Sequence, residues 1–76
     1  MAEVQMEEID STGIFSVGHD PETSTGRVRF RGKNGQPTAL YEYQDATAEE
    51  ADAIKLGGYS TFAALWKFAK PYTRIE

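Results

Sequence analysis

The most regular pattern in the chain is an alternation of polar and apolar residues over 27–31, Arg-Val-Arg-Phe-Arg. A period of two is typical of a strand with one buried face and one face in water. Asn34-Gly35 follows, and this dipeptide readily takes the positive φ angles of a tight hairpin turn. The pattern therefore predicts a β-hairpin with strands near 26–33 and 38–44.

A two-residue turn at Asn34-Gly35 also predicts which residues face each other across the hairpin. Apolar residues then share one face and arginines the other, and a slip of one residue would turn every side chain to the wrong face. The predicted pairs are Gly26 with Tyr43, Val28 with Tyr41 and Phe30 with Ala39 on one face, and Arg27 with Glu42, Arg29 with Leu40 and Arg31 with Thr38 on the other.

The segments on either side of the hairpin predict one more strand and a short helix. β-Branched and aromatic residues within 9–19 predict a first strand, bulged or kinked at Gly13. Thr47-Ala48-Glu49-Glu50 fits a capping box, in which a hydroxyl and a carboxylate satisfy each other's backbone N–H groups. This box opens a helix that Gly57-Gly58 ends.

A second helix is predicted from Ser60, its cap, to about Lys70, where Pro71 stops it. The spacing i, i+3, i+4, i+7 gives this helix a core stripe of Phe62, Leu65, Trp66 and Ala69. The fold class that follows is α+β: a three-stranded antiparallel sheet in the order β-β-β-α-α, with two helices packed on one face. We expect residues 1–8 to be a flexible acidic leader and 9–76 to form a single domain.

Charge and composition limit the classes of function that the chain can have. The formal net charge is −4, yet residues 1–26 hold six acidic and no basic residues, and the remainder holds all eight basic residues. An overall acidic protein is a poor non-specific binder of phosphate backbones, although a local basic face can still exist. There is no cysteine, and no apolar run reaches the ~20 residues that cross a bilayer. We expect a cytoplasmic monomer or weak homodimer with no membrane contact.

The order of these features resembles the KTSC domain, a module named from the C-terminal extension of some lysyl-tRNA synthetases and also found alone in bacterial and phage proteins. The resemblance is carried by Ser11-Thr12, Ile14, Val17-Gly18-His19-Asp20, Arg27-Val28-Arg29-Phe30, Gly35, Tyr41-Glu42-Tyr43, Tyr72 and Ile75. It implies a small α+β module, for which RNA binding has been suspected.

Three positions depart from the family pattern. His19 stands where the family has Tyr, Ala46-Thr47 stand where it has Val-Pro, and the signature before the last helix is altered in 57–62. If that segment carries a ligand site in the family, the site is changed here.

The candidate binding residues lie on the hairpin and on the last helix. Arg27, Arg29, Arg31 and Lys33 project from one sheet face at about 6–7 Å spacing, which suits the phosphates of a single strand or an acidic protein surface. The alternative is a solvated face with Arg27 paired to Glu42. Phe68, at the border of the core stripe, adds an aromatic on the exposed flank of the last helix.

The two tyrosines of the Tyr-x-Tyr motif allow two interpretations of their role. Tyr41 and Tyr43 could form a stacking platform for bases. The predicted register instead places them with Val28 and Phe30, which favours a mainly structural role in the core.

No catalytic or metal chemistry is predicted. His19, Asp20 and Glu22 offer one imidazole and two carboxylates in a loop, too few for a metal site. No nucleophile–base arrangement or phosphate-binding loop is present, so we expect neither an enzyme nor a cofactor.

The predicted function is therefore a small non-catalytic binding module that mediates protein–protein interaction. In one form of this hypothesis the protein is phage-encoded and acts on a host factor. The alternative is RNA or single-stranded nucleic-acid binding through the arginine-lined face.

Overall fold

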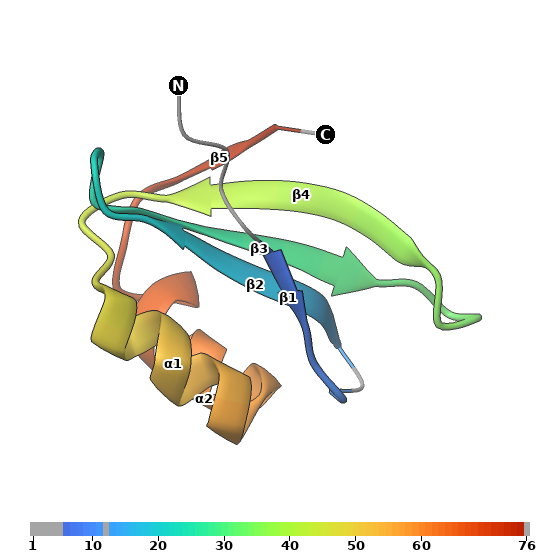
Figure 1. Ribbon diagram of the computed structural model, residues 1–76. Coiled ribbons are helices and arrows are strands. Elements are labelled where there is room, and N and C mark those ends of the chain that lie inside the picture. Colours follow the sequence, from blue (N-terminus) through green and yellow to red (C-terminus); the bar gives the residue numbers. More distant parts are fainter. Residues whose placement is uncertain (1–5, 12, 76) are drawn as a thin grey trace.

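The computed structural model describes residues 6–11 and 13–75, which form one antiparallel sheet with helices on one face (Figure 1). The strands are adjacent in chain order, β1-β2-β3-β4-β5. The elements are β1 (Met6–Glu8), β2 (Ile14–Asp20), β3 (Thr25–Arg31), β4 (Pro37–Tyr43), α1 (Ala48–Gly57), α2 (Tyr59–Phe62), the π-helical turn η1 (Ala63–Lys67) and β5 (Tyr72–Arg74). The α+β class is confirmed. The prediction of three strands is wrong, because the sheet of the described residues has five.

The first additional strand arises because the chain reverses where we expected one strand over 9–19. β1 pairs with β2, so 6–8, which we had placed in the leader, belong to the sheet. The rest of the predicted leader, 1–5, lies outside the described residues. The guanidinium of Arg31 holds the reversal: it donates from Nη2 to the carbonyl of Ile9 and from Nε to that of Ser11, each at 2.9 Å. The irregularity expected at Gly13 is a bulge between Ile14 and Ser16.

The register of the β3–β4 hairpin is confirmed away from its turn and wrong next to it. Gly26 faces Tyr43, Arg27 faces Glu42, Val28 faces Tyr41 and Arg29 faces Leu40, as predicted, but Arg31 faces Pro37. The loop has three residues rather than two: Gly35, at φ +80°, donates its N–H to Gly32 O at 3.0 Å, and Gly32 N donates to Gln36 O at 2.7 Å. A type I turn followed by a left-handed glycine is the common three-residue hairpin. A bulge opposite Phe30 then restores the predicted register.

The second additional strand, β5, follows the last helix. The helical segment ends at Lys67, earlier than the predicted Lys70, and its cap is Gly58 rather than Ser60. Pro71 cannot continue a helix, and the extended chain after it pairs with the edge of β4. Gln44 N donates to Pro71 O at 3.1 Å, and Ile75 N donates to Leu40 O at 2.7 Å. This pairing places Tyr72 beside Tyr43.

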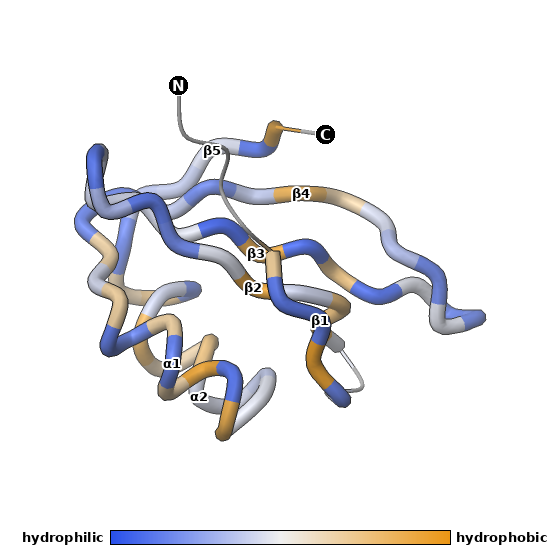
Figure 2. Tube along the Cα trace, in the orientation of Figure 1, coloured by the Kyte–Doolittle hydropathy of each residue, from blue (hydrophilic) through white to orange (hydrophobic). Residues whose placement is uncertain are grey.

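The core lies between the sheet and the helices. The alternation of hydrophilic and hydrophobic residues along β3 is visible in Figure 2, and its apolar side faces α1, α2 and η1. Trp66 is fully buried over Gly26, where a Cβ atom would lie 2.2 Å from the Trp66 ring. The core residues are Ile14, Val17, Val28, Tyr43, Ala46, Ala51, Ile54, Phe62 and Trp66.

The predicted capping box of α1 is confirmed and does more than cap the helix. Thr47 Oγ1 accepts from Glu50 N at 3.1 Å, and Glu50 Oε1 accepts from Thr47 N at 2.9 Å. The same carboxylate oxygen accepts from Trp66 Nε1 at 3.3 Å and lies 3.5 Å from Lys70 Nζ. The start of α1 is thereby tied to the end of the helical segment. No helix of the described residues is long and apolar enough to span a membrane.

Candidate functional site

The three arginines of β3 share one face of the sheet, but their guanidinium groups are used within the fold. Arg27 forms an ion pair with Glu42, with Nη2 and Oε2 3.2 Å apart. Arg29 donates from Nη1 to the carbonyl of Thr38 at 2.8 Å. Lys33 lies exposed at the hairpin loop.

Of the three arginines, Arg31 has the clearest structural role. Besides its bonds to Ile9 and Ser11, it donates from Nη1 to Gly35 O at 3.1 Å, and its Cζ lies 5.0 Å from the centre of the Phe15 ring. A guanidinium presents five N–H donors in a fixed fork, and here all three nitrogens donate to backbone carbonyls. Arg31 therefore fastens the β1–β2 turn to the hairpin loop.

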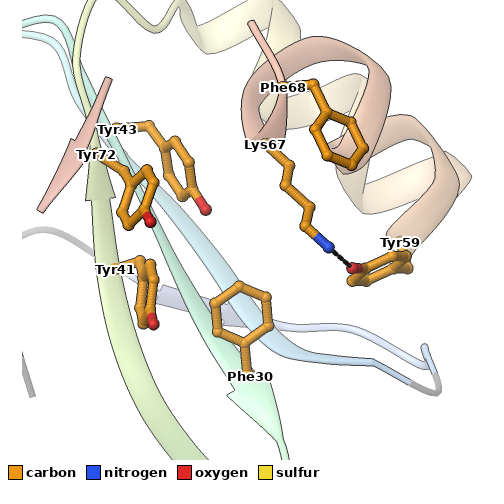
Figure 3. Close-up of a pocket in the computed structure, with 7 residues that line it drawn as sticks. All are labelled: Phe30, Tyr41, Tyr43, Tyr59, Lys67, Phe68 and Tyr72. Atoms are coloured by element: carbon orange, nitrogen blue, oxygen red, sulfur yellow. Dashed lines mark hydrogen bonds between the residues drawn. The ribbon is translucent and has the colours of Figure 1, made fainter. Parts of the chain in front are cut away.

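The opposite, helix-covered side carries a groove of about 420 Å³ between β4–β5 and the last helical segment (Figure 3). In Figure 3 one wall comes from the sheet and the other from α2, η1 and the residue after η1. Six aromatic residues and one lysine line the groove: Phe30, Tyr41, Tyr43, Tyr59, Lys67, Phe68 and Tyr72. We call this set the aromatic groove.

The sheet wall of the aromatic groove depends on β5. Tyr72 stacks on Tyr41 with ring centroids 5.3 Å apart and lies tilted against Tyr43 at 5.8 Å. Phe30 meets the edge of Tyr41 at 5.2 Å. Tyr43 is only 2% exposed and forms the base of the wall, whereas Tyr72 is 58% exposed at its rim. Tyr41 is half-buried, and Tyr72 lies between it and Tyr43 (Figure 3).

The helix wall is formed by Tyr59, Lys67 and Phe68. The Tyr59 ring lies against the backbone of residue 13, because a Cβ atom at Gly13 would come within 2.8 Å of Tyr59 Cδ2. Lys67 Nζ donates to Tyr59 Oη at 2.5 Å and lies 5.1 Å and 5.2 Å from the ring centres of Tyr59 and Phe68. The ammonium group thus meets the hydroxyl end of the Tyr59 ring, as Figure 3 shows, and lies close to the Phe68 ring, whose face attracts a cation.

The π-helical turn η1 ends at Lys67, and its wide backbone places the side chains of Lys67 and Phe68 on the helix wall. Phe68 N donates to the carbonyl five residues earlier, Ala63 O, at 3.4 Å. Such π-helical turns occur frequently at functional sites. Trp66 still points into the core, while Phe68 is 81% exposed and lies far outside the core border at which we had expected it.

The aromatic groove is cationic. Burial and the neighbouring Tyr41, Tyr72 and Tyr59 raise the pKa of Tyr43 to about 12, so this hydroxyl stays protonated at neutral pH. None of the lining residues carries a carboxylate, and Lys67 contributes one positive charge.

Part of this site could be recognised from the sequence. Phe68, Tyr41 and Tyr43 were candidates, and the structure brings all three into one groove. Tyr59, Lys67 and Tyr72 were missed as site residues. Tyr72 could have been found from the sequence, because an aromatic residue directly after a helix-ending proline can start a further strand.

The side chains of His19 and Asp20, weighed above as metal ligands, have structural roles. His19 Nε2 lies 2.7 Å from Ala46 O, and Asp20 Oδ1 accepts from Glu22 N at 3.0 Å. Within the described part of the chain, no group of three or more His, Asp or Glu side chains could hold a metal ion.

Comparison with known proteins supports the fold. No protein-family model matches the sequence, and no curated protein matches it. Among solved structures, the crystal structure of a KTSC domain protein from Yersinia pestis superposes with a TM-score of 0.76 at 19% sequence identity, covering 97% of this chain and all of that chain. The resemblance deduced from the residues is thus confirmed in three dimensions, and the chain has the fold of a KTSC domain protein.

Proposed function

We propose that this chain is a small non-catalytic binding module that mediates a protein–protein interaction through the aromatic groove. The observation that carries the proposal is the exposure of Phe68 and Tyr72, 81% and 58%, on opposite walls of one groove (Figure 3). Solvent exposure of two large aromatic side chains costs hydrophobic free energy that a partner would recover.

The composition of the groove supports a binding role. Tyrosine and phenylalanine are enriched in protein interfaces, and tyrosine is over-represented among the residues that dominate binding free energy. The groove is large enough to take side chains from a partner, since its ~420 Å³ lies within the ~300–1,000 Å³ of ordinary ligand sites.

This proposal moves the binding surface away from the arginines. Our sequence-based hypothesis combined the arginine-lined face with the exposed flank of the last helix. The flank keeps its role, because Phe68 lies there. In this proposal the module acts in the cytoplasm, and a host factor is one kind of partner if the chain is phage-encoded.

A pair of matched variants tests the proposal. Phe68→Ser removes the exposed aromatic of the groove, and Leu56→Ser removes an equally exposed apolar residue outside it, since Leu56 is 91% exposed. We expect a cross-linked partner captured by the wild-type chain to be lost with Phe68→Ser and kept with Leu56→Ser, with nuclease present throughout. Capture that is unchanged by Phe68→Ser would overturn the proposed function.

Nucleic-acid binding through the sheet face is the second candidate. It is supported by the placement of Arg27, Arg29 and Arg31 on one face, and it is weakened by their use in ion pairs and backbone hydrogen bonds. The variant Arg27→Ser/Arg29→Ser/Lys33→Ser tests it without removing the structural Arg31. If the wild-type chain binds RNA at low salt and this variant does not, the result would favour the candidate. If the wild-type chain has no affinity for mixed RNA at low salt, the candidate is excluded.

A further inference from the structure

The lysine and the tyrosine of the helix wall form a pair of hydrogen-bond donors. Tyr59 Oη accepts from Lys67 Nζ, so the hydroxyl keeps its own O–H to donate. An ammonium group has three N–H donors, and one of them is used by this bond. No acceptor for the Tyr59 O–H is found among the described residues. The pair therefore presents two adjacent donors at the groove.

The charge of Lys67 has no carboxylate partner within the described part of the chain. Two other lysines are paired with carboxylates: Lys55 of α1 lies 3.0 Å from Glu7, and Lys70, after η1, lies 3.5 Å from Glu50. Lys67 instead contacts the rings of Tyr59 and Phe68. An aromatic face attracts a cation less strongly than a carboxylate at ion-pair distance, so an incoming carboxylate can pair with Lys67 without displacing it from Tyr59.

Resting on the proposed function, we propose that the aromatic groove recognises an internal Asp or Glu side chain next to an aromatic or large apolar side chain in the partner. The carboxylate accepts from both Lys67 Nζ and Tyr59 Oη. The neighbouring apolar side chain lies between Phe68 and Tyr72, which face each other across the groove (Figure 3). On the helix wall the Lys67 ammonium meets the hydroxyl of Tyr59 and lies 5.2 Å from the centre of the Phe68 ring, so a carboxylate that reaches it comes to lie next to apolar surface, as an acid within a chain does.

A protein segment fits the groove better than a nucleic acid does. The chain carries a net charge of −4, and the groove supplies one cation, whereas binding to a phosphate backbone depends on neutralising several phosphates. A single carboxylate balances the single charge of Lys67. Nucleic acid is consequently an outcome of the test below and not part of the proposal.

The test uses blocked tetrapeptides titrated into the full isotopically labelled chain, with binding followed by NMR chemical shifts. The probes are Gly-Phe-Asp-Gly, its neutral counterpart Gly-Phe-Asn-Gly, the ring-free Gly-Ala-Asp-Gly, and hexauridylate as the nucleic-acid probe. The variants are Tyr59→Phe, which keeps the ring and removes the hydroxyl, and Lys67→Gln. Lys33→Gln removes the same charge from the exposed hairpin loop and serves as the control. The dispersion of each spectrum checks that the variant is folded.

We expect the Phe-Asp peptide to shift the amides of Lys67, Phe68 and Tyr72 and to bind about two- to fivefold more tightly than the Phe-Asn peptide, as for an exposed ion pair. The preference should disappear in Lys67→Gln, fall in Tyr59→Phe and persist in Lys33→Gln. The ring-free peptide should bind more weakly than the Phe-Asp peptide.

Three outcomes would overturn this inference: equal affinity for the Asp and Asn peptides, a preference that survives Lys67→Gln, or no shift in the groove with any peptide. Groove shifts that hexauridylate causes at lower concentrations than the peptides would overturn it in favour of a nucleic acid. Equal binding of the two peptides would leave the proposed function standing, because that function depends on the loss of a partner with Phe68→Ser.

Discussion

Tyr72 stacks on Tyr41 with ring centroids 5.3 Å apart and ring planes at 20°. The contact joins the last strand to the Tyr-x-Tyr motif of β4, and it turns a hairpin surface into the wall of a groove. Without β5, Tyr41 would lose this stacked partner, and the aromatic wall opposite Phe68 would consist of Phe30, Tyr41 and Tyr43 alone. The aromatic groove is thus completed by β5.

The packing of Trp66 on β3 leaves no room at residue 26. We expect Gly26→Ala to lower the free energy of unfolding by about 1–3 kcal/mol, because its Cβ would overlap the buried indole in a strand paired on both sides. Urea unfolding followed by tryptophan fluorescence measures the change. Unchanged stability would mean that the indole lies elsewhere.

Arg31 and Arg27 should respond differently to the same conservative change. Arg31→Lys replaces a guanidinium group that donates to three backbone carbonyls, and we expect the free energy of unfolding to fall by about 1–3 kcal/mol. Arg27→Lys keeps the charge opposite Glu42 and should cost about 1 kcal/mol or less. Urea midpoints compare the two variants, and equal losses would argue against a structural role specific to Arg31.

The elements that the sequence predicts correctly are those with strong local signals. The alternation at 27–31, the capping box at Thr47 and the glycine break at Gly58 each mark one element, and helical spacing finds the buried Phe62 and Trp66. Ala69, the last residue of the predicted core stripe, is exposed, because the helical segment ends at Lys67. Their physical causes lie within a few residues, so the pattern of the chain is enough to find them.

β1 and β5 are different because each strand is three residues long and carries no clear alternation. β5 exists because Pro71 ends the helix and β4 has an edge to pair with, and β1 exists because Arg31 fastens the turn before β2. Both causes are long-range contacts. The aromatic groove shares this origin: Tyr41 and Phe68 could be named as candidates from the sequence, but only the pairing of β5 places Tyr72 beside Tyr41, on the wall opposite Phe68.

The buried phenol of Tyr43 gives a prediction at high pH. Its folded-state pKa of about 12 lies above the ordinary value of 10.0, so stability from this group is complete below pH ~10 and is lost as the pH rises towards 12. A spectrophotometric titration of the tyrosines should show one group with a pKa of about 12 that Tyr43→Phe removes. The absence of a group with a pKa of about 12 would contradict the burial of Tyr43.

Glu50 gives the corresponding prediction at low pH. Burial would raise the pKa of its carboxyl, but hydrogen bonds from the Thr47 backbone and the Trp66 indole, with Lys70 close by, hold it below the ordinary value of 4.5. A depressed pKa stabilises the fold above the unfolded-state pKa, and this stabilisation is lost as the pH falls through the folded-state pKa. The stability difference between the wild-type chain and Glu50→Gln should therefore be full at pH 7 and shrink below pH ~4.5. A difference that stays constant down to pH 3 would count against this network.

The central claim is that the aromatic groove, and not the arginine-lined face, binds the partner. The measurement that tests it most directly is quantitative capture of a cross-linked protein partner by three chains in parallel: wild type, Phe68→Ser and Arg29→Ser. We predict that the partner is lost with Phe68→Ser and retained with Arg29→Ser. Retention with Phe68→Ser together with loss in Arg29→Ser would contradict the account and return the binding surface to the arginines.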